Sequence, residues 1–306
     1  MESKRIKGCI KGQAVGDALG LGAEFMTKED VLKNYPDGLN RFEQIIQDRH
    51  RARWKVGDWT DDTDMMLCIA NAFISDNGEI RSDTIAKNFW DWAHGTPMGI
   101  GNTIKMALND PCYLEYPDCV SRAVWEYNNC HSAANGAIMR TGIVGLLPGD
   151  VENNATMICR LTHWNPRCVG SCVIASSIIN EMFYYDNELS YVDIVQLSRR
   201  LDPRIEEYVD LAYNGTLDDL KLGDGLIGYT LKALSAALWV YWHAESFKDG
   251  MLKIINEGGD ADTNAAIACS ILGTKFYDEE IDYTLLYEDE LQSVIHSMET
   301  LLLKMQ

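Results

Sequence analysis

The chain has 306 residues, 46% of them hydrophobic, and no apolar run approaches the roughly 18 residues that would span a bilayer. Lys and Arg number 27 against 46 Asp and Glu, so the net charge of −19 disfavours nucleic acid and anionic membranes as partners. The nine cysteines contain no C-x-x-C pair, which argues against a disulfide framework or a zinc ribbon, and no apolar signal segment opens the chain. We therefore expect a cytoplasmic protein with reduced thiols.

The first expected helix carries four glycines at a spacing of four residues, at positions 8, 12, 16 and 20. This spacing places them on one face of a helix. Because each glycine costs a helix interior roughly 1 kcal/mol relative to alanine, the stripe predicts very close packing against a neighbouring backbone. The following GLGAEF does not complete G-x-G-x-x-G, and no strand precedes it, so a dinucleotide-binding fold is not expected.

Helical periodicity dominates the rest of the chain, and no stretch alternates with period two. Ser246 and Asp249 resemble a capping box that starts a helix, and Gly258 is placed to end it. The segments DPCYLEYPDC and NGTLDDLKLGDG are expected to be loops. Two apolar helix faces stand out: Met65, Ile69, Ala72 and Phe73, and Ile227, Leu231, Leu234, Ala237, Leu238 and Tyr241. No linker divides the chain, so we predict one compact all-α domain over residues 1–306.

Two acidic clusters each combine a threonine with closely spaced aspartates at an expected helix start. The first is WTDDTDMM, with Thr60, Asp61 and Asp62, and the second is GGDADT, residues 258–263. These side chains offer only oxygen ligands, which suit Mg²⁺ or Mn²⁺ rather than Zn²⁺. Four carboxylates in one place would repel each other unless cations lay between them, so two ions with a bridging carboxylate are one interpretation.

The alternative interpretation is that both clusters are ordinary helix caps, because a helix N-terminus has unpaired N–H groups and a positive potential. That potential also disfavours a cation, so the pattern alone leaves both interpretations open. A prenyl diphosphate enzyme is disfavoured because the D-D-x-x-D spacing fails at Met65. A His-Asp type of metal hydrolase is disfavoured because no His-Asp dipeptide occurs.

From about Ile6 to Gly273 the chain resembles the ADP-ribosylglycohydrolases, which include dinitrogen-reductase-activating glycohydrolases and ADP-ribosylarginine and ADP-ribosylserine hydrolases. The landmarks are GDALGLGAEF, WTDDTDM, GIGNT, ANGAIMR, THWNP and GYTLKALSAALWVYWHAESF followed by GGDADTNAAIACSILG. The resemblance implies an all-α fold with two Mg²⁺ or Mn²⁺ ions. The implied metal ligands are Thr60, Asp61, Asp62, Asp260, Asp262 and Thr263.

The resemblance also assigns roles around the implied metal centre. Glu24 matches a glutamate that lies at the metal centre in some members, and Asp61, Asp62, Glu24 and Asp260 are the expected catalytic residues. Asn135, Gly136, His163 and Tyr229 are the expected substrate-binding residues. For each a purely structural role is the alternative: a turn for Asn135 and Gly136, a structural hydrogen bond for His163, and core packing for Tyr229.

Two positions depart from the family pattern. Ala134 replaces a glycine of S-x-G-N-G, and Gly99 replaces an aspartate that precedes I-G-N-T in the nitrogenase-regulating members. The second departure argues against a nitrogenase-regulating role without affecting the metal ligands.

The implied reaction is hydrolysis of the C1″ glycosidic bond of an ADP-ribosyl group, through an oxocarbenium-like transition state. An acidic cleft favours arginine over serine as the modified residue, because the arginine leaving group is positively charged. The expected partner is an ADP-ribosylated protein or a small molecule that contains ADP-ribose, and we expect a monomer. The alternatives are an O-linked ADP-ribose hydrolase and a family member that binds ADP-ribose without cleaving it.

Overall fold

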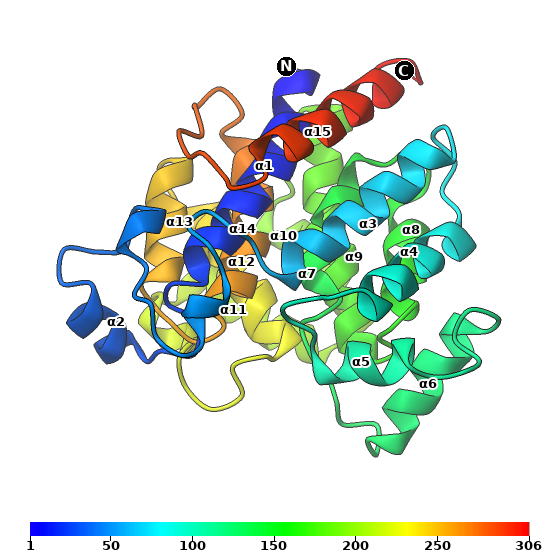
Figure 1. Cartoon of the computed structure of the whole chain (residues 1–306), viewed down its shortest axis with the longest axis horizontal. Coiled ribbons are helices and arrows are strands. Elements are labelled where there is room, and N and C mark those ends of the chain that lie inside the picture. Colours follow the sequence, from blue (N-terminus) through cyan, green and yellow to red (C-terminus); the bar gives the residue numbers. More distant parts are fainter. Residues whose placement is uncertain (306) are drawn as a thin grey trace.

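The computed structural model describes residues 1–305, and within them the regular secondary structure is helical, with loops between the helices (Figure 1). The α-helices are α1 (Glu2–Gly20), α2 (Lys28–Asn34), α3 (Asp61–Ser75), α4 (Ser82–His94), α5 (Asn102–Leu108), α6 (Pro117–Tyr127), α7 (Ile138–Thr141), α8 (Val151–Arg160), α9 (Pro166–Tyr185), α10 (Tyr191–Leu201), α11 (Arg204–Asn214), α12 (Thr230–His243), α13 (Phe247–Ile255), α14 (Ala261–Lys275) and α15 (Glu288–Leu302). Short 3₁₀ helices occupy Phe42–Gln44, Arg51–Arg53, Gly142–Leu146 and Asp218–Leu220. The predicted all-α class is confirmed, because residues 1–305 contain one isolated β-bridge and no strand.

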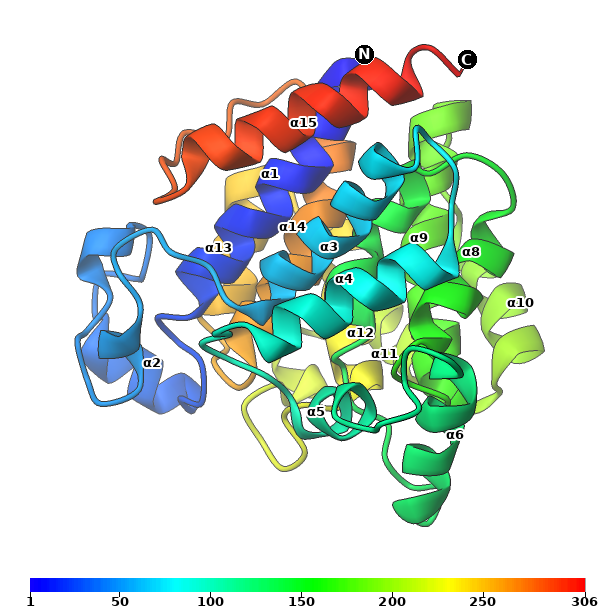
Figure 2. The ribbon, with the colours of Figure 1, turned by 45° about the vertical axis from the view of Figure 1, so that its right-hand side comes forward.

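Helices α1 and α14 run side by side through the middle of the molecule, and the remaining helices pack around them (Figure 2). Helices α12 and α13 pack on α14, and α9 packs on α8, α10 and α12. Helix α15 crosses α1, so the two chain ends lie at the same edge of the molecule. No helix within residues 1–305 has the length and hydropathy required to cross a membrane.

The glycine face of α1 lies directly on the backbone of α14, as the sequence predicts. A Cβ atom added to Gly8 would lie 2.0 Å from the carbonyl oxygen of Gly273, and one added to Gly16 would lie 2.4 Å from that of Ala265. A Cβ atom on Gly20 would meet the backbone of Ala261 at 2.5 Å. Every step of four residues along α1 is therefore matched by a step of four along α14 in the opposite direction. This antiparallel register places the end of α1 beside the start of α14.

Substitution of Gly12 by alanine is expected to lower the free energy of unfolding by about 1–3 kcal/mol, the usual cost of overpacking. The added Cβ would lie 2.4 Å from the carbonyl oxygen of Cys269, and a helix backbone atom cannot move aside without separating the helices. Urea unfolding measures the change. Gly101→Ala is the control, because its Cβ would meet no atom closer than 3.9 Å. Equal unfolding free energies for the two variants would contradict the proposed packing.

Local signals fix several helix ends. Ser246 accepts a hydrogen bond from the Asp249 N–H and starts α13, and Gly258, with φ +70°, follows its end. The helix whose apolar face was predicted to begin at Ile227 begins instead at Thr230. The preceding residues are held out of the helix by the β-bridge between Ala134 and Tyr229, next to which the N–H of Thr230 bonds to the carbonyl of Ala133. The predicted loop DPCYLEYPDC ends earlier than expected, since α6 starts at Pro117, where proline suits a first turn.

Candidate metal centre and ligand cavity

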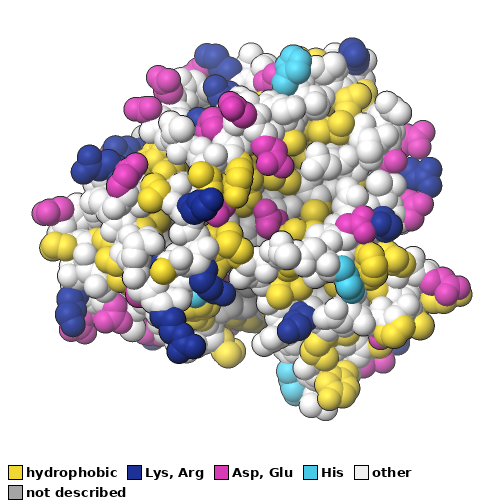
Figure 3. Space-filling model, viewed as in Figure 1, with side chains coloured by type: hydrophobic (Ala, Val, Ile, Leu, Met, Phe, Trp, Pro, Cys, Tyr) yellow, Lys and Arg dark blue, Asp and Glu magenta, His cyan; other side chains and the backbone are white. Residues whose placement is uncertain are grey.

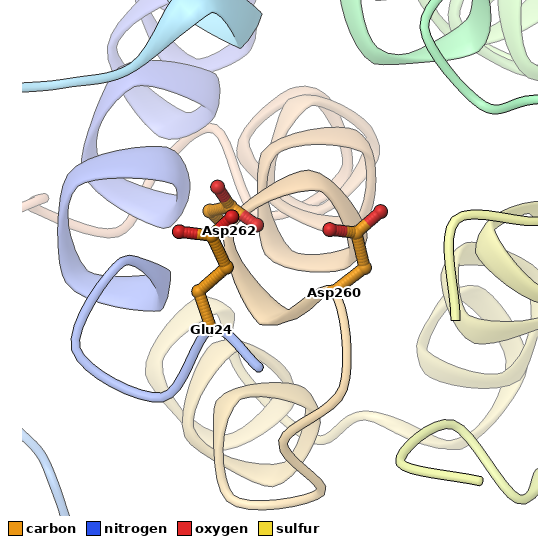
Figure 4. Close-up of side chains that lie close together, drawn as sticks. All are labelled: Glu24, Asp260 and Asp262. Carbon is orange, nitrogen blue, oxygen red and sulfur yellow. The ribbon is translucent and has the colours of Figure 1, made fainter. Parts of the chain in front are cut away.

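Three carboxylates from distant parts of the sequence meet where α1 ends and α14 begins (Figure 4). Glu24 comes from the turn after α1, and Asp260 and Asp262 come from the first turn of α14. Each offers an oxygen atom, and these atoms lie within 4.8 Å of one another. The glycine register of α1 and α14 causes this meeting, because Gly20 packs against Ala261 and the Cα atom of Asp262.

Capping of helix N-termini does not account for the second acidic cluster. Asp260 occupies the N-cap position of α14, but its side chain makes no capping hydrogen bond. Instead its carboxylate accepts a hydrogen bond from the Asn135 side chain at 2.6 Å. For the first cluster the capping interpretation is correct in part, because the Thr60 side chain accepts a bond from the Asp62 N–H at the start of α3. Capping therefore explains part of the first cluster but not the Asp260 side chain, and the metal-site interpretation stays a prediction.

The remaining predicted ligands lie at the same place. Thr60 and Asp61 line one cavity together with Glu24, Asp260 and Asp262. Asp62 is only 2% exposed and, besides this burial, Asp61 and Asp260 are both close enough to raise its pKa, and the Thr263 hydroxyl bonds to its carboxylate.

Asp17 holds the first cluster in position, a role that the sequence reading missed. Its carboxylate, fully buried, accepts hydrogen bonds from the backbone N–H groups and the hydroxyls of both Thr60 and Thr63. The N-terminus of α3 is thereby attached to α1. Burial raises the pKa of Asp17 to about 7, although these four hydrogen bonds act in the opposite direction. The one available signal was a charged residue in the last turn of a glycine-rich helix, among small and apolar residues.

The electrostatics of this cluster suit bound cations. Burial, aided by the neighbouring carboxylates, raises the pKa of Asp61 to about 7 and that of Asp260 to about 6. The same causes raise the pKa values of Asp62 and Asp262. One buried oxygen of Asp62 and one of Asp262 have no hydrogen-bond partner among residues 1–305. An all-oxygen donor set with unsatisfied carboxylate oxygens fits Mg²⁺ or Mn²⁺.

These residues border a cavity of about 750 Å³, a volume typical of small-molecule sites. In Figure 3 the surface is hollowed between the side that carries α2 and the lobe formed by α5 and α6. The lining includes acidic residues, backbone of two glycine-containing loops, and cationic or aromatic side chains of the 50–54 segment. It is made up of Glu24, Phe25, His50, Arg53, Trp54, Thr60, Asp61, Met98, Gly99, Ile100, Gly101, Asn102, Thr103, Ile104, Ala134, Asn135, Gly136, Met139, His163, Gly228, Asp260 and Asp262.

The predicted substrate loop is fixed beside the carboxylates. The Asn135 N–H bonds to the carbonyl of Gly228, and the adjoining bridge joins Ala134 to Tyr229. Gly136 has no room for a side chain, since an added Cβ would lie 2.8 Å from Ile104 and 3.2 Å from His163. The glycine therefore allows the close approach of these side chains within the turn that the sequence predicts.

His163 presents a hydrogen-bond donor to the cavity. Arg140, fully buried, donates to the Thr162 hydroxyl oxygen at 2.6 Å, and that oxygen lies 2.8 Å from His163 Nδ1. The Thr162 proton has no other recorded acceptor within residues 1–305, so we assign it to Nδ1, which leaves the ring proton on Nε2. Burial and the nearby Arg140 lower the pKa of His163 to about 3, so the ring is neutral at physiological pH.

Tyr229 and Asp64 lie beside the cavity rather than in its lining. Tyr229 accepts a hydrogen bond from Arg167 at 3.0 Å, and its ring packs edge-on against Tyr208. Its predicted contact with substrate stays a prediction. Asp64 accepts bonds from the indole N–H groups of Trp59 and Trp92, at 2.9 and 3.0 Å. This aspartate therefore joins α3 to α4, which a first-turn position alone did not indicate.

The sequence and the fold were compared with those of known proteins. The family model described as ADP-ribosylglycohydrolase matches residues 2–290. The chain is 26% identical to the ADP-ribosyl-[dinitrogen reductase] glycohydrolase of Rhodospirillum rubrum, over 90% of this chain and 87% of that protein. It is 28% identical to an ADP-ribosylarginine hydrolase of Serratia proteamaculans, over 89% of this chain and 71% of that protein.

A solved structure titled as an ADP-ribosylglycohydrolase-related protein complex superposes with a TM-score of 0.75. The superposition covers 98% of both chains at 21% sequence identity, which supports the likeness of fold alone. The family model, by contrast, matches most of the chain and so shows the family. This chain belongs to the ADP-ribosylglycohydrolase family.

Proposed function

We propose that this protein is a metal-dependent hydrolase that removes ADP-ribose from arginine side chains of modified proteins. The observation that carries the proposal is the joining of Glu24, Asp260 and Asp262 with Thr60 and Asp61 in one cavity. Asn135, Gly136 and His163 line the same cavity and provide polar groups for a ligand. The activities named for the two curated relatives are consistent with this reaction class.

Two Mg²⁺ or Mn²⁺ ions would be held by the six predicted ligands, Thr60, Asp61, Asp62, Asp260, Asp262 and Thr263, with Glu24 beside them. When bound, such ions supply positive charge that offsets the repulsion among the carboxylates and orients the ribose hydroxyls. Asn135 supports this arrangement by donating to Asp260, and Asp17 supports it by fixing Thr60.

The chain's own residues would bind the sugar and handle the proton of the attacking water. The Nε2–H group of His163 donates to an acceptor such as a phosphate or hydroxyl oxygen of the ligand. Asp61 and Glu24 reach the cavity, so they are better placed than the more deeply buried Asp62 to accept the proton. The negative charge of the cluster also stabilises the oxocarbenium-like transition state, in which the sugar becomes positively charged.

The test is the release of free ADP-ribose from ADP-ribosylated arginine and serine peptides, each with Mg²⁺ or Mn²⁺ added. We expect faster release from the arginine peptide, because the guanidinium is attracted to an acidic cavity. Faster release from the serine peptide would favour an O-linked activity instead. Binding of ADP-ribose without release from any linkage would contradict catalysis and favour a binding role.

Substitution of Thr162 by valine is expected to weaken ADP-ribose binding about tenfold, because the variant loses the hydroxyl that fixes the His163 tautomer. One hydrogen bond of about 1–1.5 kcal/mol corresponds to that factor. Calorimetric titration with ADP-ribose measures it. Thr274→Val is the matched control, since the hydroxyl of Thr274, also fully buried, bonds to the carbonyl of Ser270 in α14 and to the Cys9 side chain in α1, and Thr274 does not line the ligand cavity. An unchanged affinity for Thr162→Val would disprove the role of the Thr162 hydroxyl.

Two further expectations concern the whole chain. We propose that residues 1–306 act as one domain and that the protein is a monomer. Size-exclusion chromatography with light scattering checks the second of these, with 34.4 kDa as the expected mass.

A further inference from the structure

Glu24 has a hydrogen-bond partner outside the aspartate cluster. Its Oε2 atom lies 2.5 Å from Nε2 of His50, a residue of the irregular segment that precedes α3. We propose that His50 is a positioning residue that holds the Glu24 carboxylate against Asp260 and Asp262, and that Arg53 fixes His50 for this task. The proposal rests on the proposed function only for the role of Glu24 at the metal centre.

The direction of the hydrogen bonds follows from Arg53. Its guanidinium lies 2.8 Å from His50 Nδ1, and because a guanidinium carries only donors, Nδ1 is the acceptor. The ring proton is therefore on Nε2, which donates it to Glu24. The three side chains form a chain of donors that runs from Arg53 to His50 to Glu24. The proposed positioning role does not require any of the three side chains to gain or lose a proton.

The ring of His50 is fixed by packing as well. It packs against the rings of Phe25 and Trp54, with centroid distances of 5.1 and 5.3 Å. The Arg53 guanidinium lies 4.4 Å above the Trp54 ring and also bonds to the carbonyls of His50 and Met98. Arg53 thus connects the two borders of the cavity, and His50 has little freedom to rotate away from Glu24.

The backbone around Glu24 is held by the same segment. Arg51, 4% exposed, donates to the carbonyls of Leu21, Gly22 and Glu24. The next residue, Phe25, has φ +60°, a conformation that is unfavourable for a residue with a side chain, and its N–H bonds to the carbonyl of Gly259 at 2.6 Å. The segment therefore fixes both the turn and the side chain that the turn presents.

A donor is needed at this point because Glu24 is surrounded by like charges. Its carboxylate lies within 4.8 Å of those of Asp260 and Asp262, and it is among the groups that raise the pKa values of Asp61, Asp260 and Asp262. Repulsion would turn a free glutamate side chain toward solvent. The hydrogen bond from His50 opposes that movement, in the way that outer partners orient metal ligands generally.

The experiment measures the affinity of the full chain for Mn²⁺ alone by isothermal titration calorimetry. We expect His50→Ala to weaken binding about tenfold, the lower end of the range for lost outer partners of a metal site. His50→Gln places an amide N–H where Nε2 was, so it should restore most of the affinity. His94→Ala is the control, because the imidazole of His94, which is exposed, bonds to the carbonyl of Trp90 in its own helix and stacks on the Trp90 ring, away from the lining of the ligand cavity.

A double-mutant cycle with Glu24→Gln distinguishes the loss of the His50–Glu24 hydrogen bond from a general loss of structure. In that background His50→Ala should have little further effect on Mn²⁺ affinity. Wild-type affinity in His50→Ala, equal losses in His50→Ala and His50→Gln, or a wild-type chain that binds no Mn²⁺ would each overturn the proposal. The Mn²⁺ titrations use no substrate. An absence of ADP-ribose release would therefore contradict the proposed function without affecting the evidence that His50 positions Glu24.

Discussion

Asp260→Asn is expected to lower kcat/KM for ADP-ribose release by about 1000-fold, equivalent to about 4 kcal/mol of transition-state stabilisation. The substitution keeps the shape of the side chain and its place at the start of α14. It removes the negative charge that Asn135 contacts at 2.6 Å and that neighbours Glu24 and Asp262. The Mn²⁺ affinity of the same variant, measured without substrate, should fall in parallel.

Asp64→Asn is the matched control for this change. It alters the same charge in the first turn of a neighbouring helix, but Asp64 bonds to the indoles of Trp59 and Trp92 and does not line the ligand cavity. We expect this variant to retain most of its activity and to lose some thermal stability. Full activity in Asp260→Asn, or an equal loss of activity in Asp64→Asn, would show that the metal centre is assigned wrongly.

The helices and the contact between α1 and α14 could be predicted because both depend on local patterns. Helical periodicity gave the fold class, and the spacing of Gly8, Gly12, Gly16 and Gly20 gave the close contact. The identity of the partner helix could not be read from that stripe, because a glycine face specifies proximity and no particular neighbour. The structure supplies it, and thereby explains why Glu24 meets residues more than 230 positions away.

Residues that act through long-range hydrogen bonds could not be found from the sequence. His50 lies 26 residues from Glu24 in a segment without regular periodicity, and Asp17 reaches Thr60 across 43 residues. The same holds for Tyr229, whose local pattern suits either the core or a ligand. Only the folded chain shows its bond to Arg167. Its ligand contact therefore stays a prediction.

Stability of the metal-free protein should fall as the pH rises from about 5 to 8. In the folded chain burial raises the pKa of Asp61 to about 7 and that of Asp260 to about 6, from 3.8. A carboxyl whose folded pKa exceeds its unfolded pKa stabilises the folded state fully below the unfolded value, and this contribution disappears as the pH passes the folded value. For these two groups the loss is on the order of a few kcal/mol. Mg²⁺ or Mn²⁺ should reverse the trend, because cations bind the deprotonated carboxylates and compete with protons.

Urea unfolding at pH 5.5, 6.5 and 7.5, with EDTA or with 5 to 10 times the Kd of Mn²⁺, measures both parts of this prediction. Other groups titrate in the same range, so the control is Asp61→Asn combined with Asp260→Asn. That double variant should show a flatter dependence on pH in EDTA and little stabilisation by Mn²⁺. A wild-type chain whose stability in EDTA rises with pH relative to the double variant would mean that these carboxylates are charged in the metal-free fold. Protein groups would then offset the energetic cost of burying these charges, and the argument that cations are needed to stabilise the cluster would no longer hold.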